Sequence, residues 1–349
     1  MEDTYIEKSC RESDMWKMYR FAEKADEVNW NVRYKPNDRF MKFMIPHMLD
    51  CAEESIKKVT FEKENLRAVI GLSGGLDSCV SAWLIANAMS RGIERESSKS
   101  GKLTLLTFNG MSQEDLEYGR KFGEDLKEKF PKIEIKYIER DIRPLMKKIH
   151  DFTEEMINST KGNKTYPGEL ATRLMCLSIL EYADKTGHCE IDSTNGSEIV
   201  LGEIVLGMGF EYSPISDLYK SQVFDLGNIM NIPKYIMDRN PINSTFGNDK
   251  IKSYFGEIPE NFKARDVYAV LDTILFHIFD KKMKPTEIAQ KLGHSETFIK
   301  KVYQRVKNQD HRRRTLYFAL NDKITDLPRT IKDKSNCDFN KYLEECFLW

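Results

Sequence analysis

The chain has 349 residues with a formal net charge of −1, and 40% of them are hydrophobic and 31% charged. This composition is typical of a soluble globular protein that holds one large α/β domain with appendages or two modest domains, without a basic field for nucleic acid or an apolar run of the roughly 20 residues that cross a bilayer. Seven scattered cysteines without a CxxC pair, and a polar N-terminus without an apolar signal-peptide core, indicate a reducing cytoplasm and no membrane partner.

The predicted elements begin with a helix and continue as strands that alternate with helices. Apolar residues at helical spacing predict a helix over 40–58, within a helical N-terminal extension that we place at 1–60. Short apolar runs then predict buried strands, and amphipathic or apolar stretches predict the helices between them. The predicted strands cover 66–72, 103–110 and 133–142, and the helices cover 79–90 and 111–130. This alternation predicts a doubly wound, mostly parallel sheet in a domain over 61–325, followed by a C-terminal tail at 326–349.

A Gly/Ser loop at the end of the first predicted strand carries the strongest functional signal. The loop reads Ser73-Gly74-Gly75-Leu76-Asp77-Ser78. Two adjacent glycines let the backbone approach an anion closely, and the following helix adds its positive N-terminal end. The two serines supply hydroxyl donors, and Asp77 supplies a carboxylate for Mg²⁺. The lysine of a Walker A motif is missing, so the sequence predicts a phosphate site of another kind rather than an ordinary polar turn.

This hexapeptide resembles the SGGxDS signature of the ATP pyrophosphatases, a superfamily that includes NAD, GMP and asparagine synthetases and tRNA-thiolating enzymes. The resemblance implies that the loop binds the phosphates of ATP and that a substrate is activated as its adenylate with release of pyrophosphate. It also implies an adenine nucleotide α-hydrolase-like fold, with ATP and Mg²⁺ as the bound nucleotide and metal.

Two further segments resemble the ammonia-dependent NAD synthetases of that superfamily. Residues 192–202, DSTNGSEIVLG, are similar to the family pattern GTxNxSExxLG. Residues 214–226, PISDLYKSQVFDL, are similar to PIxDLYKTQVxxL. The resemblance covers about residues 40–317 and implies an enzyme that amidates a carboxylate with ammonia and releases AMP.

Within these segments the resemblance assigns roles to single residues. It implies that Thr194 and Lys220 contact ATP, that Lys220 and Asp77 are catalytic, and that Glu198 shares Mg²⁺ with Asp77. A carboxylate and an ammonium group suit those roles, since both act on phosphate charge. The alternative interpretations are a helix N-terminal carboxylate for Glu198 and a solvated surface lysine for Lys220.

The C-terminal part allows two interpretations. EIAQKLGHSETFIKKV has the rhythm of a helix-turn-helix with a glycine in its turn, which leaves a nucleotide- or DNA-binding protein as an alternative. NAD synthetases end in a similar helical segment and a short basic stretch, here at 311–314. This resemblance implies that Arg312 and Arg313, with Arg173 and Asn195, contact the small-molecule substrate and that nucleic acid is not a partner.

The sequence also departs from the family pattern around the carboxylate substrate. The loop at 203–213 is two residues shorter and lacks a Lys and an Asp of the family, with Glu211 in place of a second Asp. The family element ARxRM reads ATRLM here and keeps only Arg173. The ATP-binding half of the site is therefore retained and the half that binds the acid is altered. The acid is deamido-NAD or another carboxylate, and we predict little or no activity on deamido-NAD.

The source of nitrogen and the partners follow from what the chain lacks. Residues 1–60 are too few for a glutaminase domain, so ammonia is expected, either free or from a separate partner protein. The family resemblance implies a homodimer. A sulfur-transferring enzyme of the same superfamily is the other alternative, for which Cys176 and Cys189 are the candidate thiols.

Overall fold

The structure is a computed structural model, and it describes residues 21–60, 64–109, 113–157, 167–205, 208–239, 254–256, 258–260 and 262–309. A four-stranded parallel sheet lies at its centre, in the order β3-β2-β1-β4. Its strands are β1 (Asn65–Gly71), β2 (Ser100–Asn109), β3 (Glu134–Asp141) and β4 (Cys189–Ile191). The predicted strands are present, and the predicted doubly wound α/β fold is confirmed.

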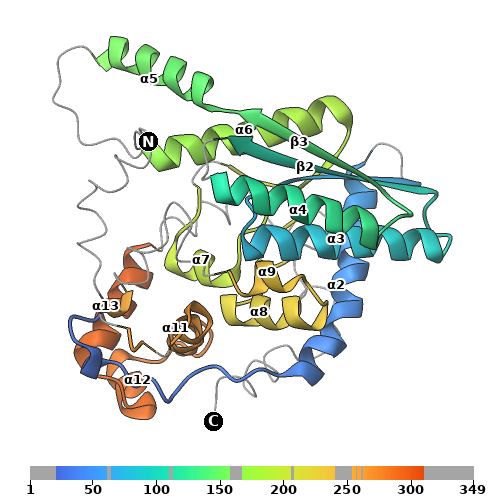
Figure 1. Cartoon of the computed structure of the whole chain (residues 1–349). Helices are drawn as coiled ribbons and strands as arrows, with labels where there is room; N and C mark the ends of the chain where they lie inside the picture. The colour runs from blue at the N-terminus through green and yellow to red at the C-terminus, as the bar shows by residue number, and fades with distance from the viewer. Residues whose placement is uncertain are drawn as a thin grey trace.

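Helices cover both faces of the sheet (Figure 1). One face packs against α2 (Asp38–Val59), α3 (Leu76–Glu94) and α4 (Gln113–Lys129), and the other against α6 (Pro167–Thr186), beside which α5 (Arg143–Ile157) lies. Two separate hydrophobic clusters fill these layers because the buried strands are apolar on both sides. The strands in Figure 1 end at the same edge, which is where ligands bind in such folds.

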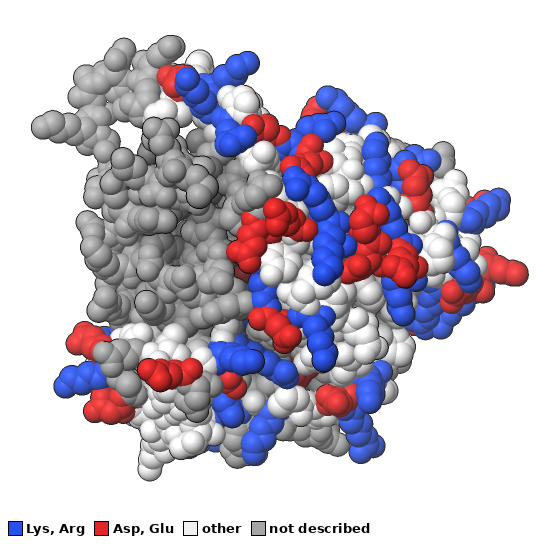
Figure 2. Space-filling view, viewed as in Figure 1, with Lys and Arg blue, Asp and Glu red and all other residues white. Residues whose placement is uncertain are grey.

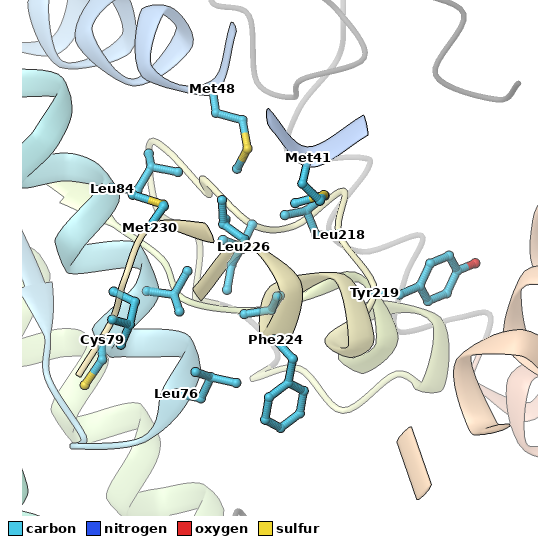
Figure 3. Close-up of a cluster of buried hydrophobic side chains, with 14 of the residues drawn as sticks. Met41, Met48, Leu76, Cys79, Leu84, Leu218, Tyr219, Phe224, Leu226 and Met230 are labelled. Atoms are coloured by element: carbon cyan, nitrogen blue, oxygen red, sulfur yellow. The ribbon is translucent and has the colours of Figure 1, made fainter. Parts of the chain in front are cut away.

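The core on the first face fixes the helices that carry the candidate site. Leu76 and Cys79 at the start of α3 are buried with Leu218, Tyr219 and the side chains of α8 (Lys220–Ile229) (Figure 3). Methionines of α2 close this cluster from the other side. Packing therefore holds the beginning of α3 and the beginning of α8 together, and these are the segments that carry the phosphate-loop and PIxDLYK-like motifs.

The helices that remain lie below the sheet in Figure 1. They are the 3₁₀ helix η2 (Ala25–Glu27), α7 (Gly196–Leu201), α9 (Lys234–Met237), α11 (Ala264–Phe279), α12 (Pro285–Leu292) and α13 (Glu296–Asn308). The helix-turn-helix-like pair is α12 and α13, joined at Gly293 with a left-handed φ of 68°. The apolar face of α13 is buried, and Gln309 at its end lies against Gly202 at the end of α7. The pair therefore supports the candidate site from below.

The predicted boundary at residue 60 remains a prediction, although α2 packs against β1 and α3 as part of the same core. Residues 310–349, which include Arg312 and Arg313, lie outside the described residues. None of the helices that the structure describes combines the length and the hydropathy that a bilayer span needs.

Candidate active site

The phosphate loop is a compact turn that connects β1 to α3. The Ser78 hydroxyl donates to the Gly75 carbonyl at 3.1 Å and accepts from the Ser73 N–H at 3.2 Å. The Ser73 hydroxyl lies 3.0 Å from that of Ser78 and accepts from the Gly75 N–H at 3.2 Å. We expected these hydroxyls as donors to phosphate, whereas here they hold the loop, and the helix begins at Leu76 with its N-terminal end facing the turn.

Gly74 is the residue that needs to be glycine in this turn. Its φ is +71°, and a Cβ built on it would lie 2.6 Å from the Asp115 carbonyl oxygen, in the first turn of α4. Gly75, in contrast, has an ordinary φ of −83°. The left-handed position lies one residue earlier, because Gly74 is where the chain reverses beneath α4.

Arg239 clamps the same loop and was missed at the sequence level. It donates to the Gly74 carbonyl at 2.8 Å and forms an ion pair with Asp115, with side-chain exposures of 8% and 3%. Its guanidinium lies 4.6 Å from the centre of the Tyr118 ring. Burial lowers the pKa of Arg239 from its usual range. No local signal predicts this clamp, since 124 positions separate the two ion-pair partners.

Gly74→Ala is expected to weaken ATP binding by at least tenfold and to lower the free energy of unfolding by about 1–3 kcal/mol, because a Cβ meets rigid backbone at a left-handed φ. Gly75→Ala is the matched control, since its Cβ meets only the Ser73 hydroxyl oxygen, at 3.2 Å. Calorimetric titration with ATP and thermal unfolding of both variants measure the difference. Wild-type affinity and stability in Gly74→Ala would contradict the role given to this turn.

Lys220 and Asp77 form a buried ion pair at the end of the loop. The ammonium group of Lys220, at the start of α8, pairs with Asp77 Oδ2, and the side-chain exposures are 6% and 19%. The interpretation of Lys220 as a solvated surface lysine is therefore wrong. Asp77 Oδ1 is buried and makes no hydrogen bond to any residue that the structure describes. A buried cation and an unsatisfied carboxylate oxygen beside a phosphate-type loop favour a ligand site, because such groups are costly without a partner.

A buried carboxylate on α11 fixes the position of Lys220. Asp272 is fully buried and accepts from Ser197 at 2.6 Å and from the Ser221 hydroxyl and N–H at 2.6 and 2.8 Å. Ser197 in turn accepts from the Lys220 N–H at 2.8 Å. Burial raises the pKa of Asp272 to about 6, against the lowering effect of these hydrogen bonds and of Lys220. Asp272 thus ties α7 and α8 to α11, and its place inside the apolar run YAVLDTILFHIF was the signal that could have revealed it.

The start of α7 carries three of the predicted site residues. Asn195 and Glu198 form a capping box, in which Asn195 Oδ1 accepts from the Glu198 N–H at 3.1 Å and Glu198 Oε2 accepts from the Asn195 N–H at 3.2 Å. Glu198 therefore lies in a helix and not in a loop. Thr194 donates its N–H and hydroxyl to Asp192 at 3.1 and 2.9 Å, and Asp192 also accepts from Ser213.

Tyr268 of α11 lies beside Lys220. Its ring centre is 5.7 Å from Lys220 Nζ. Burial raises its pKa well above the usual value, and the neighbouring carboxylates of Glu203, Glu198 and Asp77 add to that shift. Arg173, in contrast, is an exposed residue of α6 on the other face of the sheet.

The site suits Mg²⁺ as a metal shared with phosphate. No cluster of three or more His, Cys, Asp or Glu side chains arranged for a metal occurs in the described ranges, so the protein there builds no closed metal cage. Asp77 Oδ1 has no protein partner within those ranges and is a hard oxygen ligand. Mg²⁺ is commonly held by one or two carboxylates together with substrate phosphates, and these residues fit that arrangement.

A pair of glutamates joins β4 to the segment that leads to Lys220. Ile191 bridges Tyr212, and this brings Glu190 beside Glu211, the residue in the family's Asp position. Burial, together with charge repulsion from Glu211 and Asp184, raises the pKa of Glu190 to about 7. The pKa of Glu211 is raised by burial as well. Two neighbouring carboxylates repel each other when both are ionised, so the pair favours a shared proton. We therefore expect this pair to change its protonation near neutral pH.

Glu190→Gln is expected to flatten the pH dependence of stability between about pH 4.5 and 7. The folded-state pKa of Glu190 exceeds its ordinary 4.5, so its contribution is complete below that value and is lost as the pH rises through about 7. The glutamine variant cannot ionise and should be the more stable protein at pH 8, with a melting temperature higher by several degrees. Thermal unfolding from pH 5 to 8 measures this. A wild-type profile in Glu190→Gln would contradict it.

Comparison with known proteins agrees with this geometry. The NAD synthase family model matches residues 44–316. The chain is 26% identical over 273 residues to the NH(3)-dependent NAD(+) synthetase of Pyrococcus furiosus (77% of this chain, 93% of that protein) and 27% identical over 268 residues to that of Helicobacter acinonychis (75% and 90%). The structure titled NMN synthetase from Francisella tularensis shares the fold, with a TM-score of 0.55 and 20% identity over 78% of this chain and 95% of that one. The chain belongs to the NAD synthase family and is a carbon–nitrogen ligase.

Proposed function

We propose that the protein activates a carboxylate by adenylation at the phosphate loop and then amidates it with ammonia. The carboxylate oxygen attacks the α-phosphorus of ATP and pyrophosphate leaves; ammonia then attacks the acyl carbon, and AMP and a proton leave. The observation that carries the proposal is the buried Lys220–Asp77 pair beside the left-handed turn at Gly74. Its cation and its unsatisfied oxygen suit a polyphosphate and its metal.

Each residue has a separate task in this proposal. The loop N–H groups and the start of α3 hold the β- and γ-phosphates. Lys220 exchanges its contact with Asp77 for the pyrophosphate oxygens and stabilises the charge that develops on them. Asp77 and Glu198 would hold Mg²⁺, which would supply positive charge to neutralise the phosphates. Asp272 positions Lys220 through Ser197 and Ser221.

The acid is proposed to be a nicotinate nucleotide with fewer phosphate charges than deamido-NAD. The class is supported by the names of the curated relatives, which are NAD synthetases. The smaller charge is supported by the missing Lys at 203–213 and by Arg173, which is exposed on α6. The test is amide formation from nicotinate mononucleotide and from deamido-NAD, each with ATP and ammonium. Equal or higher kcat/KM with deamido-NAD would overturn this choice and leave the amidation proposal standing.

Free ammonia is the proposed nitrogen source, whether from solution or from a separate supplying protein, and a reducing cytoplasm is the proposed location. A homodimer is supported by large apolar side chains on α5 and α6, where Leu145, Phe152 and Leu177 are 42%, 63% and 55% exposed. Light scattering should give twice the mass of the 40.8 kDa chain. The mass of a single chain at micromolar concentration would contradict the dimer.

The sulfur-transfer alternative requires a reactive thiol, and the candidates do not favour one. Burial raises the pKa of Cys176 to about 11, and it raises that of the buried Cys189 well above its usual value. Thiolate nucleophiles normally have lowered pKa values. Cys176→Ala is therefore expected to keep pyrophosphate release within about twofold of wild type, with Cys51→Ala, at a buried cysteine of α2, as the matched control. A loss of activity confined to Cys176→Ala would favour sulfur transfer.

A further inference from the structure

A basic pocket lies at the opposite end of the sheet from the phosphate loop. It has a volume of about 730 Å³ and is lined by the first residues of β1, β2 and β3 and the last turn of α6. The strand ends to which it belongs are at the right of Figure 1, away from the arrowheads. From Arg67, β1 runs about 20 Å to the phosphate loop, so the pocket is a separate site.

The lining of this pocket is strongly cationic, although the whole chain has a net charge of −1. One carboxylate, Glu134, lies among the lining residues. The cations that line it are Arg67, Lys99, Lys102, Lys132, Lys136 and Lys185. Figure 2 shows that Lys and Arg are mixed with Asp and Glu over the described surface in that view. The lining of the pocket therefore differs from the mixed surface in that view.

The rim cations already have carboxylate partners, but these pairs are weak. Lys99 pairs with Glu64, Lys132 with Glu94 and Lys185 with Glu181. Every one of these side chains is more than half exposed. Exposed pairs contribute about 0–1 kcal/mol, so a bound anion can replace them at little cost. Even with these carboxylates counted, the cations outnumber the acids.

The floor of the pocket is ordered by the pairing of the strands. Register places Arg67 beside Lys102 and Lys102 beside Glu134, with Lys136 one row further along β3. The Lys102–Glu134 distance is 2.7 Å. The inner wall is neutral and polar, with His188 Nδ1 3.1 Å from the Thr186 carbonyl oxygen, which fixes the proton on Nδ1. Burial, with a smaller contribution from the positive charges of Arg67 and Lys102, lowers the pKa of His188 to about 4, against the raising effects of the Thr186 carbonyl and of Glu134.

We propose that this pocket binds a small oligophosphate anion, of the pyrophosphate, tripolyphosphate or nucleoside polyphosphate class, as a second site on the enzyme. Its volume suits a small molecule, and several converging lysines and an arginine suit several phosphate groups in one ligand. The six cations line one pocket of about 730 Å³, which favours a compact anion over a nucleic-acid strand. The inference depends on the pocket alone and stands whichever acid the enzyme amidates.

The test is calorimetric titration of the full-length protein with tripolyphosphate at low salt. We expect two sites per chain, one at the phosphate loop and one at this pocket. The double variant Lys102→Met/Lys136→Met should lose the second site, with at least about tenfold weaker binding for each lysine removed. Lys300→Met is the matched control, because Lys300 is 63% exposed and ion-paired on the distant helix α13. It should keep both sites.

Titrations of a single variant and of other anions determine which class of ligand the pocket binds. Lys136 is exposed, so Lys136→Met alone tests the pocket if the double variant does not fold. Pyrophosphate and ATP should compete for the second site, whereas inorganic phosphate should bind at least tenfold more weakly. An unchanged isotherm in both pocket variants would overturn the proposal. So would binding of a single-stranded oligonucleotide at the pocket without binding of tripolyphosphate.

Discussion

Asp77→Asn is expected to lower the rate of pyrophosphate release by about 10²–10³-fold, the range found when one preorganised electrostatic group is removed from an active site. Asp77 accepts from Lys220 through Oδ2, and its other oxygen is buried without a hydrogen bond among the described residues. The amide of asparagine is a much poorer ligand for Mg²⁺ than a carboxylate. It also leaves the buried ammonium group of Lys220 without its counter-ion.

The control for this variant is Asp225→Asn, which removes another buried, paired carboxylate. Asp225 accepts from Tyr34 at 2.6 Å and from Arg265 at 2.7 Å, away from the phosphate loop. Both variants should lose stability, but only Asp77→Asn should lose the chemical step. Initial rates at saturating Mg²⁺, with melting temperatures for both proteins, separate the two effects. Near-normal turnover of a folded Asp77→Asn would show that this carboxylate is not needed.

Lys220→Met is expected to lower kcat by about 10²–10³-fold while the dissociation constant for ATP rises less than about tenfold. Lys220 pairs with Asp77, so part of the free energy of any ground-state contact between Lys220 and ATP is offset by the loss of that pair. The charge on the leaving pyrophosphate grows as the P–O bond breaks, and the benefit of the ammonium group is then largest.

Lys57→Met is the matched control for Lys220→Met. Lys57 is a partly buried lysine on α2 that pairs with Glu53 at 2.5 Å, and it lies outside the candidate site. Its kcat should stay within about twofold of wild type. Single-turnover rates and ATP titrations of both variants give the comparison. Equal losses of affinity and rate in Lys220→Met would mean that the lysine serves only as a ground-state contact.

The sequence predicted the parallel sheet well because the signals for it are local. Apolar runs bounded by Gly, Ser and charged residues placed β1, β2 and β3 within a few residues of their observed ends. The phosphate loop was predictable for the same reason, since two glycines, two serines and a carboxylate occupy six consecutive positions. The sequence does not show which of the two glycines takes the left-handed φ, because the sign of φ depends on how α4 packs over the turn.

The contacts between distant segments could not be predicted in the same way. Lys220 and Asp77 are 143 positions apart, and their pairing follows from the packing of α3 against α8. Asp272 and Arg239 hold these segments in place, yet each looks ordinary in its own stretch of sequence apart from the apolar neighbours of Asp272. For Glu198 the local signal was sufficient for one of its two interpretations. Its position at a helix N-terminus was given as the alternative and is present as a capping box, whereas its metal-binding role stays a prediction.

We expect this protein to cleave ATP between its α- and β-phosphates in order to form an amide. The most direct measurement is ³¹P NMR of the products from ATP, Mg²⁺, ammonium and a panel of nicotinate nucleotides, with mass spectrometry of the amide. We expect AMP, pyrophosphate and amide in equal amounts, only when an accepted acid is present, and formed about 10²–10³-fold more slowly by Asp77→Asn. ADP and inorganic phosphate as products, or pyrophosphate formed without any amide, would contradict the account.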